Sequence, residues 1–327
     1  MISKLSILCC TLLMMSQTFK AQYMISDTVT IKSKIFDSER KVILTKPKHN
    51  DKILAPQLFI YFDADDPEIN GMVLQSANVL TGNQEIPKSV LIGIMQVDRN
   101  TEFLSKDTLL KFLIDELLPY LRNKQIDTSR ITLIGHSFGG YFATYAFLKK
   151  NSTFSSCIAI SPAYWPNKQD IFVSPDFLKN VSGNFYMALG DRRWDEISLG
   201  KYAIKMRDLM KTSEHIRFRF DDLKGFGHNA TIAVGFGLGL NYIFDEWEWQ
   251  NILKEQERRL KSDPDFWGFL EIQAEALCHL HRGSEADKVF KQAIQAVKND
   301  RTLEKSESQL IIKRIKKKRK TACSTNI

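Results

Sequence analysis

Cysteine is scarce in this sequence. The chain has 327 residues and five cysteines, and two of these, Cys9 and Cys10, fall in an apolar stretch near the N-terminus. The other three, Cys157, Cys278 and Cys323, are an odd number and lie far apart along the chain. Disulfide scaffolds and zinc sites have paired or closely spaced cysteines. The sequence therefore predicts neither a disulfide framework nor a metal cluster, and cysteine is not expected to carry the chemistry.

A strong excess of charge is missing from most of the chain. The formal net charge is +8 at pH 7, but seven basic residues lie together between residues 313 and 320, which leaves +1 for the remainder. A protein that binds nucleic acid normally presents a basic face on its folded domain. A nucleic-acid partner is therefore not predicted.

Long hydrophobic runs are missing too, with one short exception at the N-terminus. Lys4 precedes an apolar run over residues 5–15, and polar residues and then Ala21 follow it. This is the layout of a secretory signal peptide, and the run is too short to span a bilayer stably. We expect residues 1–21 to be removed and the mature protein to be periplasmic or secreted, with no stable membrane insertion.

Short apolar runs alternate with helical patterns over residues 22–249. The segment 28–45 alternates apolar and polar residues around a polar turn, which is typical of a half-exposed β-hairpin. Helical patterns cover 108–121 and 138–148. The remaining runs are solidly apolar, as expected of strands covered on both faces: 58–62, 90–95, 131–134, 157–160, 185–189 and 216–220. The predicted fold class is α/β, with a mainly parallel sheet, helices on both faces and ligands at the carboxyl ends of the strands.

A G-x-S-x-G motif, Gly135-His136-Ser137-Phe138-Gly139, follows the third apolar run. Glycine is needed there because the turn from strand to helix is too sharp for a side chain, and the turn holds the serine hydroxyl above the sheet. The following helix would point its first amide groups at the oxygen that becomes negative during acyl transfer. The context of strand, motif and helix predicts that Ser137 is a nucleophile.

A serine needs a general base, and four histidines follow Ser137 in the sequence. His215 directly precedes a predicted strand, and His279 and His281 lie in a late helical segment. His228 lies in a glycine-rich loop after the last predicted strand, at the sheet edge where a base is required. We therefore expect His228 to be the base.

The acid should follow the preceding strand, and three carboxylates compete in the segment 190–196. Asp191 is close to the strand end, which would limit its reach. Asp195 lies deeper in the segment and is favoured, with Glu196 second and Asp191 third.

The sequence resembles the Putative esterase (esterase D-like) family of the α/β-hydrolase superfamily, which includes siderophore and feruloyl esterases. The match covers about 28–249. It rests on these segments: Ser38-Glu39-Arg40, Tyr61-Phe62-Asp63-Ala64-Asp65, Gly93-Ile94 with Asp98-Arg99, Glu116 to Tyr120, the motif around Ser137, and Phe154 with Ile160 to Trp165.

The resemblance implies a serine esterase that acts on a small-molecule ester without cofactor or metal. Ser137, His228 and Asp195 take the roles of the catalytic triad by this resemblance. The oxyanion hole would use the backbone N–H groups of Phe138 and Ala64, although Ala64 stands where the family usually has glycine. Trp165 and Arg99 would line or brace the acyl pocket.

Two other functions remain open at this point. The pair Asp63 and Asp65 after an apolar run resembles the D-x-D of magnesium-dependent phosphatases, with Asp221 and Asp222 as a later metal carboxylate pair. This alternative leaves the serine motif and His228 without a role. The other alternative is a catalytically weak hydrolase fold that serves as a binding scaffold.

The composition becomes helical and charged beyond residue 249. Residues 250–298 are predicted to be a helical appendage that resembles a single tetratricopeptide-type pair, and docking on the hydrolase is the default expectation. Residues 299–327 are polar and basic and are expected to be disordered.

Overall fold

The computed structural model describes residues 24–47, 57–321 and 323. The predicted signal peptide therefore lies outside the described residues. The chain divides into two compact units, and each is described here by itself. The N-terminal unit extends to Gly82 and resumes over Lys88–Gly237, whereas the C-terminal unit contains Asn83–Pro87 and the chain from Leu238 onward. The division thus comes earlier than the boundary expected at residue 249.

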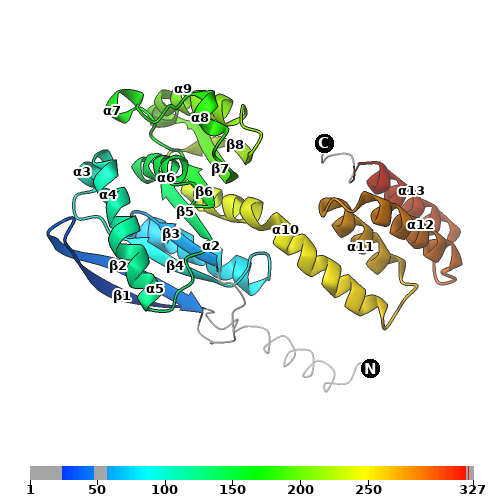
Figure 1. Ribbon diagram of the computed structural model, residues 1–327. Helices are drawn as coiled ribbons and strands as arrows, with labels where there is room; N and C mark the ends of the chain where they lie inside the picture. The colour runs from blue at the N-terminus through cyan, green and yellow to red at the C-terminus, as the bar shows by residue number, and fades with distance from the viewer. Residues whose placement is uncertain (1–23, 48–56, 322, 324–327) are drawn as a thin grey trace, which may run out of the picture. The chain divides into compact units, whose positions relative to one another are not determined.

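A single eight-stranded sheet forms the centre of the N-terminal unit (Figure 1). Its order is β1-β2-β4-β3-β5-β6-β7-β8, in which β1 and β2 form an antiparallel hairpin and the strands from β3 onward run parallel. The strands are β1 (Met24–Ser33), β2 (Ser38–Pro47), β3 (Gln57–Tyr61), β4 (Ser89–Ile94), β5 (Ile131–His136), β6 (Ser156–Ile160), β7 (Gly183–Arg192) and β8 (Ile216–Gly227). The hairpin and the mainly parallel sheet predicted from the apolar patterns are confirmed.

Helices cover both faces of this sheet, which explains why its strands are solidly apolar. Leu58 and Ile60 of β3 enter a large core cluster with side chains of the helices between Lys106 and Lys149. On the other face, Tyr61 donates a hydrogen bond to Asn70 of the helix α2. The helices of this unit are α2 (Pro67–Gly82), α3 (Arg99–Leu104), α4 (Lys106–Phe112), α5 (Leu118–Asn123), α6 (Phe138–Lys149), α7 (Pro166–Gln169), α8 (Pro175–Leu178) and α9 (Arg193–Met210).

The helix expected over 108–121 is interrupted in the structure. A π-helical segment, Leu113–Leu117, separates α4 from α5. Pro119 lies in the first turn of α5, and because proline has no backbone N–H it cannot continue the regular hydrogen-bond ladder. The missing N–H of Pro119 therefore explains why the backbone pairing changes from α-helical to π-helical before α5.

The C-terminal unit has its own apolar core, built from α10 (Ile232–Leu260), α11 (Trp267–His279), α12 (Gly283–Asn299) and α13 (Lys305–Thr321). The start of α10 belongs to the N-terminal unit, where a Cβ at Gly235 would come within 2.7 Å of the Ile160 side chain. The expected helical pair corresponds to α11 and α12. Buried residues along one face of α12, such as Phe290 and Val297, pack into this core.

The basic tail is helical, which corrects the expectation of disorder after residue 299. Ile315 of α13 is fully buried. Three of the basic residues form ion pairs with α11 and α12: Arg314 with Glu271, Lys318 with Glu271 and Glu275, and Arg319 with Asp287. The composition of residues 299–327 alone suggested a solvated segment, because the acidic residues that pair with the basic ones lie in distant parts of the sequence.

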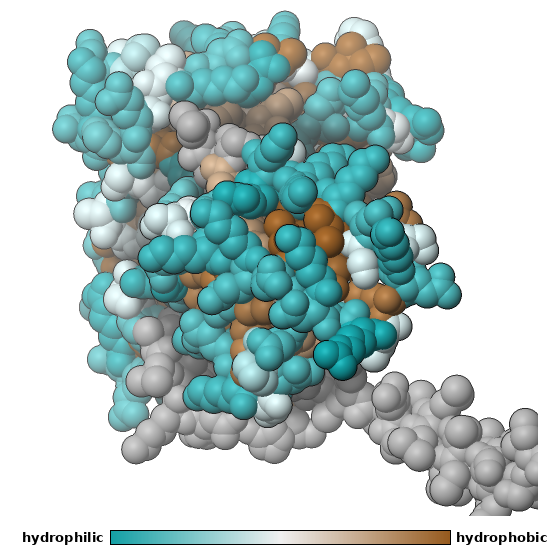
Figure 2. All heavy atoms as spheres, turned by 90° about the vertical axis from the view of Figure 1, so that its right-hand side faces the viewer, coloured by the Kyte–Doolittle hydropathy of each residue, from teal (hydrophilic) through white to brown (hydrophobic). Residues whose placement is uncertain are grey.

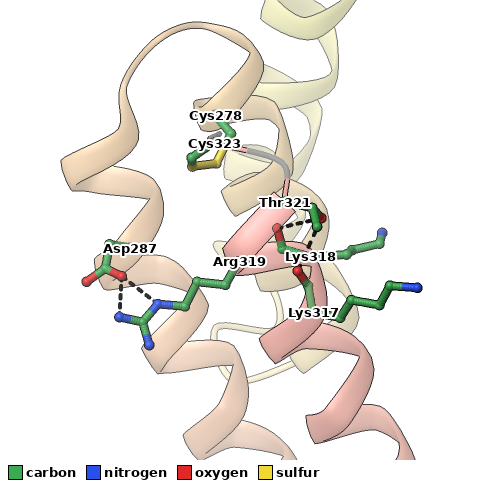
Figure 3. The surroundings of a disulfide bond; sticks show 7 residues. All are labelled: Cys278, Asp287, Lys317, Lys318, Arg319, Thr321 and Cys323. Carbon is green, nitrogen blue, oxygen red and sulfur yellow. Dashed lines mark hydrogen bonds and ion pairs between the residues drawn. A yellow bond between two sulfur atoms is a disulfide. The ribbon is translucent and has the colours of Figure 1, made fainter. Parts of the chain in front are cut away.

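A disulfide joins Cys278 of α11 to Cys323, which follows α13 (Figure 3). The absence of a disulfide was predicted from the wide spacing of the cysteines, and that prediction is wrong. The two residues are 45 positions apart, and only the packing of α13 against α11 brings them together. Arg319 reaches Asp287 of α12 in the same region, whereas Lys317 points away from it (Figure 3).

Hydrophilic side chains predominate on the face shown in Figure 2, with hydrophobic ones in small groups between them. Among the described residues, no helix combines the length and the apolar character needed to cross a bilayer.

Candidate functional site

Ser137 occupies a strained turn between β5 and α6. Its backbone has φ 56° and ψ −118°, a conformation that is unfavourable for a residue with a side chain. A Cβ on Gly135 would come within 2.2 Å of the backbone of Gly139, and one on Gly140 within 3.1 Å of Pro162. The glycines therefore allow strand and helix to approach closely enough for this turn. The strand, turn and helix predicted around Ser137 are confirmed.

The backbone donors near Ser137 differ from those expected. Phe138 is the first residue of α6, so its N–H has no partner within the helix. The N–H of Ala64, by contrast, donates to the carbonyl of Ile94 at 3.0 Å. The structure thus does not leave Ala64 free to serve as the second oxyanion donor. Asp65 comes next in the chain, and its N–H has no partner among the described residues.

Asp63 and Arg99 form a bidentate pair beside this turn. Arg99 Nε lies 2.6 Å from Asp63 Oδ1 and Nη2 lies 3.0 Å from Oδ2. The Asp63 side chain is buried, and that burial raises the pKa of its carboxyl, a shift that Arg99 opposes. Both Asp63 oxygens are therefore engaged by a guanidinium.

This pairing argues against the phosphatase alternative. Within the described residues, no group of three or more His, Cys, Asp or Glu side chains is arranged to hold a metal ion. Asp221 and Asp222 lie within β8 rather than at its carboxyl end, and Asp221 accepts a hydrogen bond from Tyr186. Asp63 is thus occupied by Arg99, and the acidic residues proposed for the metal do not gather around it.

Trp165 and Arg99 both lie against the ring of Phe138. The ring centres of Trp165 and Phe138 are 5.7 Å apart, and the Arg99 guanidinium carbon lies 5.6 Å from the centre of the same ring. Trp165 is 50% exposed. The two residues expected to line the acyl pocket are therefore beside the residue that follows Ser137.

His228 follows the end of β8 and lies next to the turn that carries Ser137. Its ring centre is 4.5 Å from that of His136, the neighbour of Ser137. Its Nδ1 lies 3.6 Å from Oε1 of Glu196. The structure thus places a carboxylate on one side of the imidazole. A small movement would bring the two groups within hydrogen-bond distance.

The carboxylate beside His228 belongs to Glu196 and not to Asp195. The strand β7 continues to Arg192 and α9 begins at Arg193, so both acids lie in the first turn of a helix. Successive helical residues point about 100° apart, so only one of the two can face the interior. Glu196 is buried and Asp195 is exposed. The carboxylate that the structure places beside His228 is therefore Glu196, the second choice from sequence, rather than the favoured Asp195.

Asp191 has a different partner. Its carboxylate accepts a hydrogen bond from the backbone N–H of Gly225 at 2.7 Å. Gly225 lies near the end of β8, three residues before His228. Asp191 therefore holds the end of β8 and does not face the imidazole.

Three polar residues that sequence reasoning did not single out surround His228 and Glu196. Ser161 donates to Glu196 Oε1 and lies 2.9 Å from the Thr231 hydroxyl, oxygen to oxygen. Thr231 in turn donates to the carbonyl of His228 at 2.6 Å. His136 Nε2 is 3.1 Å from the same carbonyl. Ser161 was part of the motif Ile160 to Trp165, but only the folded chain brings it to Glu196.

The tautomer of His136 follows from this contact. A carbonyl oxygen can only accept, so His136 Nε2 must carry the proton that it donates to His228. Burial lowers the pKa of His136 to about 3, and the proximity of His228 contributes in the same direction. His136 is therefore a neutral donor throughout the pH range in which an esterase works.

The stability of the protein should depend on His136 at acidic pH. An unfolded histidine titrates near 6.5 and the folded one near 3, so between these values only the unfolded chain binds the proton. The free energy of unfolding should then fall as the pH drops below 6.5, by up to about 1.4 kcal/mol per pH unit. His136→Gln keeps an N–H donor but does not titrate. Urea unfolding at pH 7, 5.5 and 4.5 should show a shallower dependence in this variant; equal slopes would contradict the prediction.

Comparison with known families connects this geometry to a group of enzymes. The model of the family described as Putative esterase matches residues 33–268. The ferri-bacillibactin esterase BesA of Bacillus subtilis is 30% identical over 134 residues, which cover 38% of this chain and 46% of that protein. The siderophore enterobactin esterase of Emericella nidulans is 35% identical over 68 residues, 20% of this chain and 22% of that protein. The matched segments thus span less than half of either relative.

Solved structures share the architecture at low sequence identity. An IroE-like serine hydrolase from Shewanella oneidensis has a TM-score of 0.61 and 14% identity, over 82% of this chain and 99% of that one. An uncharacterised protein from Capnocytophaga ochracea has a TM-score of 0.58 and 18% identity, over 91% and 100%. The predicted α/β-hydrolase fold is confirmed by these likenesses together with the sheet order.

Proposed function

Because this chain belongs to the Putative esterase family, we propose that it hydrolyses carboxylic esters with Ser137 as nucleophile, His228 as general base and Glu196 as acid. The observation that carries the proposal is the position of His228, whose ring lies between the turn of Ser137 and the buried carboxylate of Glu196. This order of serine, acid and histidine along the chain is that of the α/β-hydrolases.

The reaction would proceed in two steps. The hydroxyl of Ser137 attacks the ester carbonyl while its proton passes to Nε2 of His228, and Glu196 stabilises the imidazolium that forms. The tetrahedral intermediate expels the alcohol, which takes the proton from His228, and an acyl-enzyme remains. Water attacks this ester with His228 again as base, and the carboxylic acid is released.

The negative oxygen of the intermediate needs backbone donors. The N–H of Phe138 at the start of α6 would supply one donor, and the positive end of the dipole of that helix would further stabilise the negative oxygen. We infer that the N–H of Asp65 takes the second position in place of Ala64, because Ala64 is committed to Ile94.

The surroundings of Phe138 suit an aromatic ester. Trp165 presents a half-exposed indole for stacking beside the Phe138 ring, and Arg99, held by Asp63, contacts the same ring. The two relatives are named as esterases of ferri-bacillibactin and of the siderophore enterobactin. We infer that a siderophore ester is the substrate class, with Trp165 and Arg99 contacting its acyl part.

We also propose that the protein is exported after removal of residues 1–21. The layout of these residues supports it, and so does the Cys278–Cys323 disulfide, because disulfides persist mainly in oxidising compartments.

A fluorophosphonate probe tests the proposed function directly. We expect covalent labelling of the wild-type protein, with the added mass on the peptide that contains Ser137. We also expect hydrolysis of an ester panel containing enterobactin and simple aryl esters, with equal rates in the presence and absence of EDTA. Strict dependence on added Mg²⁺ would favour the phosphatase. The absence of both labelling and hydrolysis would favour the binding scaffold.

A further inference from the structure

Two hydroxyl groups lie buried between the acid and the base. Ser161 follows β6 and Thr231 lies between β8 and α10, so they are 70 residues apart in the chain. Both residues are fully buried. Because neither is accessible, neither can contact a substrate, and their polar atoms must be satisfied inside the protein.

The direction of each hydrogen bond follows from counting protons. Each hydroxyl has one proton to donate, whereas an ionised carboxylate and a carbonyl can only accept. The proton of Ser161 goes to Glu196, because a bond to a charged acceptor is the strongest one available to it. The proton of Thr231 goes to the carbonyl of His228. The two hydroxyl oxygens lie 2.9 Å apart, but because both protons are donated elsewhere, Ser161 acts on the acid and Thr231 acts on the base as two separate donors.

Glu196 depends on Ser161 for its only hydrogen-bond donor among the described residues. Its Oε2 is buried without a hydrogen-bond partner in that part of the protein, and so is Nδ1 of His228. A carboxylate out of contact with water is costly to keep ionised unless donors stabilise the charge. Ser161 supplies that donor and fixes one oxygen of Glu196.

Thr231 acts on the other partner. Two donors, the Thr231 hydroxyl and His136 Nε2, converge on the backbone carbonyl of His228. They hold the loop in which His228 lies, although Asn229 and Ala230 next to it are exposed. The imidazole of His228 faces Glu196 from α9 and His136 from β5.

We propose that Ser161 and Thr231 are positioning residues for the esterase reaction. Ser161 holds the carboxylate oxygen of Glu196 that faces His228, and Thr231 fixes the backbone carbonyl of His228. This inference rests on the proposed function, because it assigns roles through Glu196 and His228.

Kinetics of hydroxyl-deletion variants test the proposal. Ser161→Ala and Thr231→Val should each lower kcat by about 10 to 100-fold with little change in KM, because a small misplacement of catalytic groups has effects of that size. Ser161→Ala should also move the acidic limb of the kcat/KM profile to lower pH, since a less stabilised carboxylate supports the imidazolium less well. Thr231→Ser, which retains the hydroxyl, should restore most of kcat.

Ser156→Ala is the matched control, because it deletes a buried serine hydroxyl at the other end of β6. Its kcat and pH profile should stay close to those of the wild type. Should Ser161→Ala fail to fold by circular dichroism, the comparison of Thr231→Val with Thr231→Ser decides the question alone. Wild-type kcat and pH profiles in both deletion variants would overturn the proposal and leave the esterase function intact.

A second readout separates this inference from the proposed function. In protein labelled with ¹⁵N-histidine, the imidazole NMR signals of His228 should change position in Ser161→Ala and stay in place in Ser156→Ala. If the wild-type protein hydrolyses no ester, this result would confirm the contact network around His228 but refute the esterase function. Unchanged His228 signals together with an unchanged kcat in Ser161→Ala would refute the role of Ser161 in an active enzyme.

Discussion

Ser137→Ala should lower kcat for ester hydrolysis by at least about 10⁴-fold and abolish labelling by fluorophosphonates. The variant has no hydroxyl to form the acyl-enzyme, and only the oxyanion donors and substrate binding remain to accelerate the reaction. Alanine is smaller than serine and occupies the same backbone position, so the turn should be preserved. Initial rates on an aryl ester and intact-mass spectra after labelling provide the measurement.

Ser152→Ala is the matched control for this substitution. Ser152 is exposed in the turn after α6, so loss of its hydroxyl should change neither the rate nor the labelling. Comparable circular dichroism spectra of both variants would exclude unfolding as the cause of inactivity. Persistent hydrolysis by Ser137→Ala would show that another group carries the reaction, and the mechanism proposed here would be wrong.

The strand, turn and helix that carry Ser137 could be predicted from sequence because their constraints are local. The motif specifies glycines at positions where the structure leaves no room for a Cβ, as at Gly135. The apolar runs on either side specify a buried strand and a helix without reference to distant residues. The location of His228 beside this turn could be predicted for a similar reason, since a parallel sheet collects the residues that follow its strands at one edge.

The carboxylate that lies beside His228 could not be predicted, because its identity depends on where a strand ends and a helix begins. A loop of several residues after β7 would have favoured Asp195. The observed strand continues to Arg192 and the helix begins one residue later, so a shift of a single position decides which carboxylate is buried. Element boundaries are the least certain part of a sequence-based assignment.

The expectations for Ala64 as an oxyanion donor and for disorder after residue 299 differ from the structure for another reason. In both cases the groups concerned bind partners that are distant in sequence. The N–H of Ala64 is taken by Ile94 of the neighbouring strand. Arg314 and Arg319 of α13 form ion pairs with Glu271 and Asp287 of other helices. Both outcomes depend on which groups the fold brings together, and composition contains no such information.

Glu196→Gln should lower kcat by up to about 10⁴-fold while leaving the fold intact. Glutamine can keep an oxygen in the position of Oε1, which accepts from Ser161 and faces Nδ1 of His228, so the buried side chain retains both contacts. Its amide is neutral, however, and therefore does not stabilise the imidazolium that forms during the reaction. The pre-steady-state rate of acylation by an aryl ester would measure this loss directly.

Asp195→Asn and Asp191→Asn are the matched amide controls, and both should retain near-normal kcat. Asp195 is exposed, and asparagine at position 191 still offers an oxygen to the N–H of Gly225. The kcat of Glu196→Asp should lie between those of the wild type and Glu196→Gln. Aspartate retains the negative charge, but its side chain is one methylene shorter and holds the charge farther from His228. Full activity in Glu196→Gln would mean that Ser137 and His228 work as a dyad. Inactivity of Asp195→Asn alone would require the first turn of α9 to rotate when substrate binds, since only then could that carboxylate reach the imidazole.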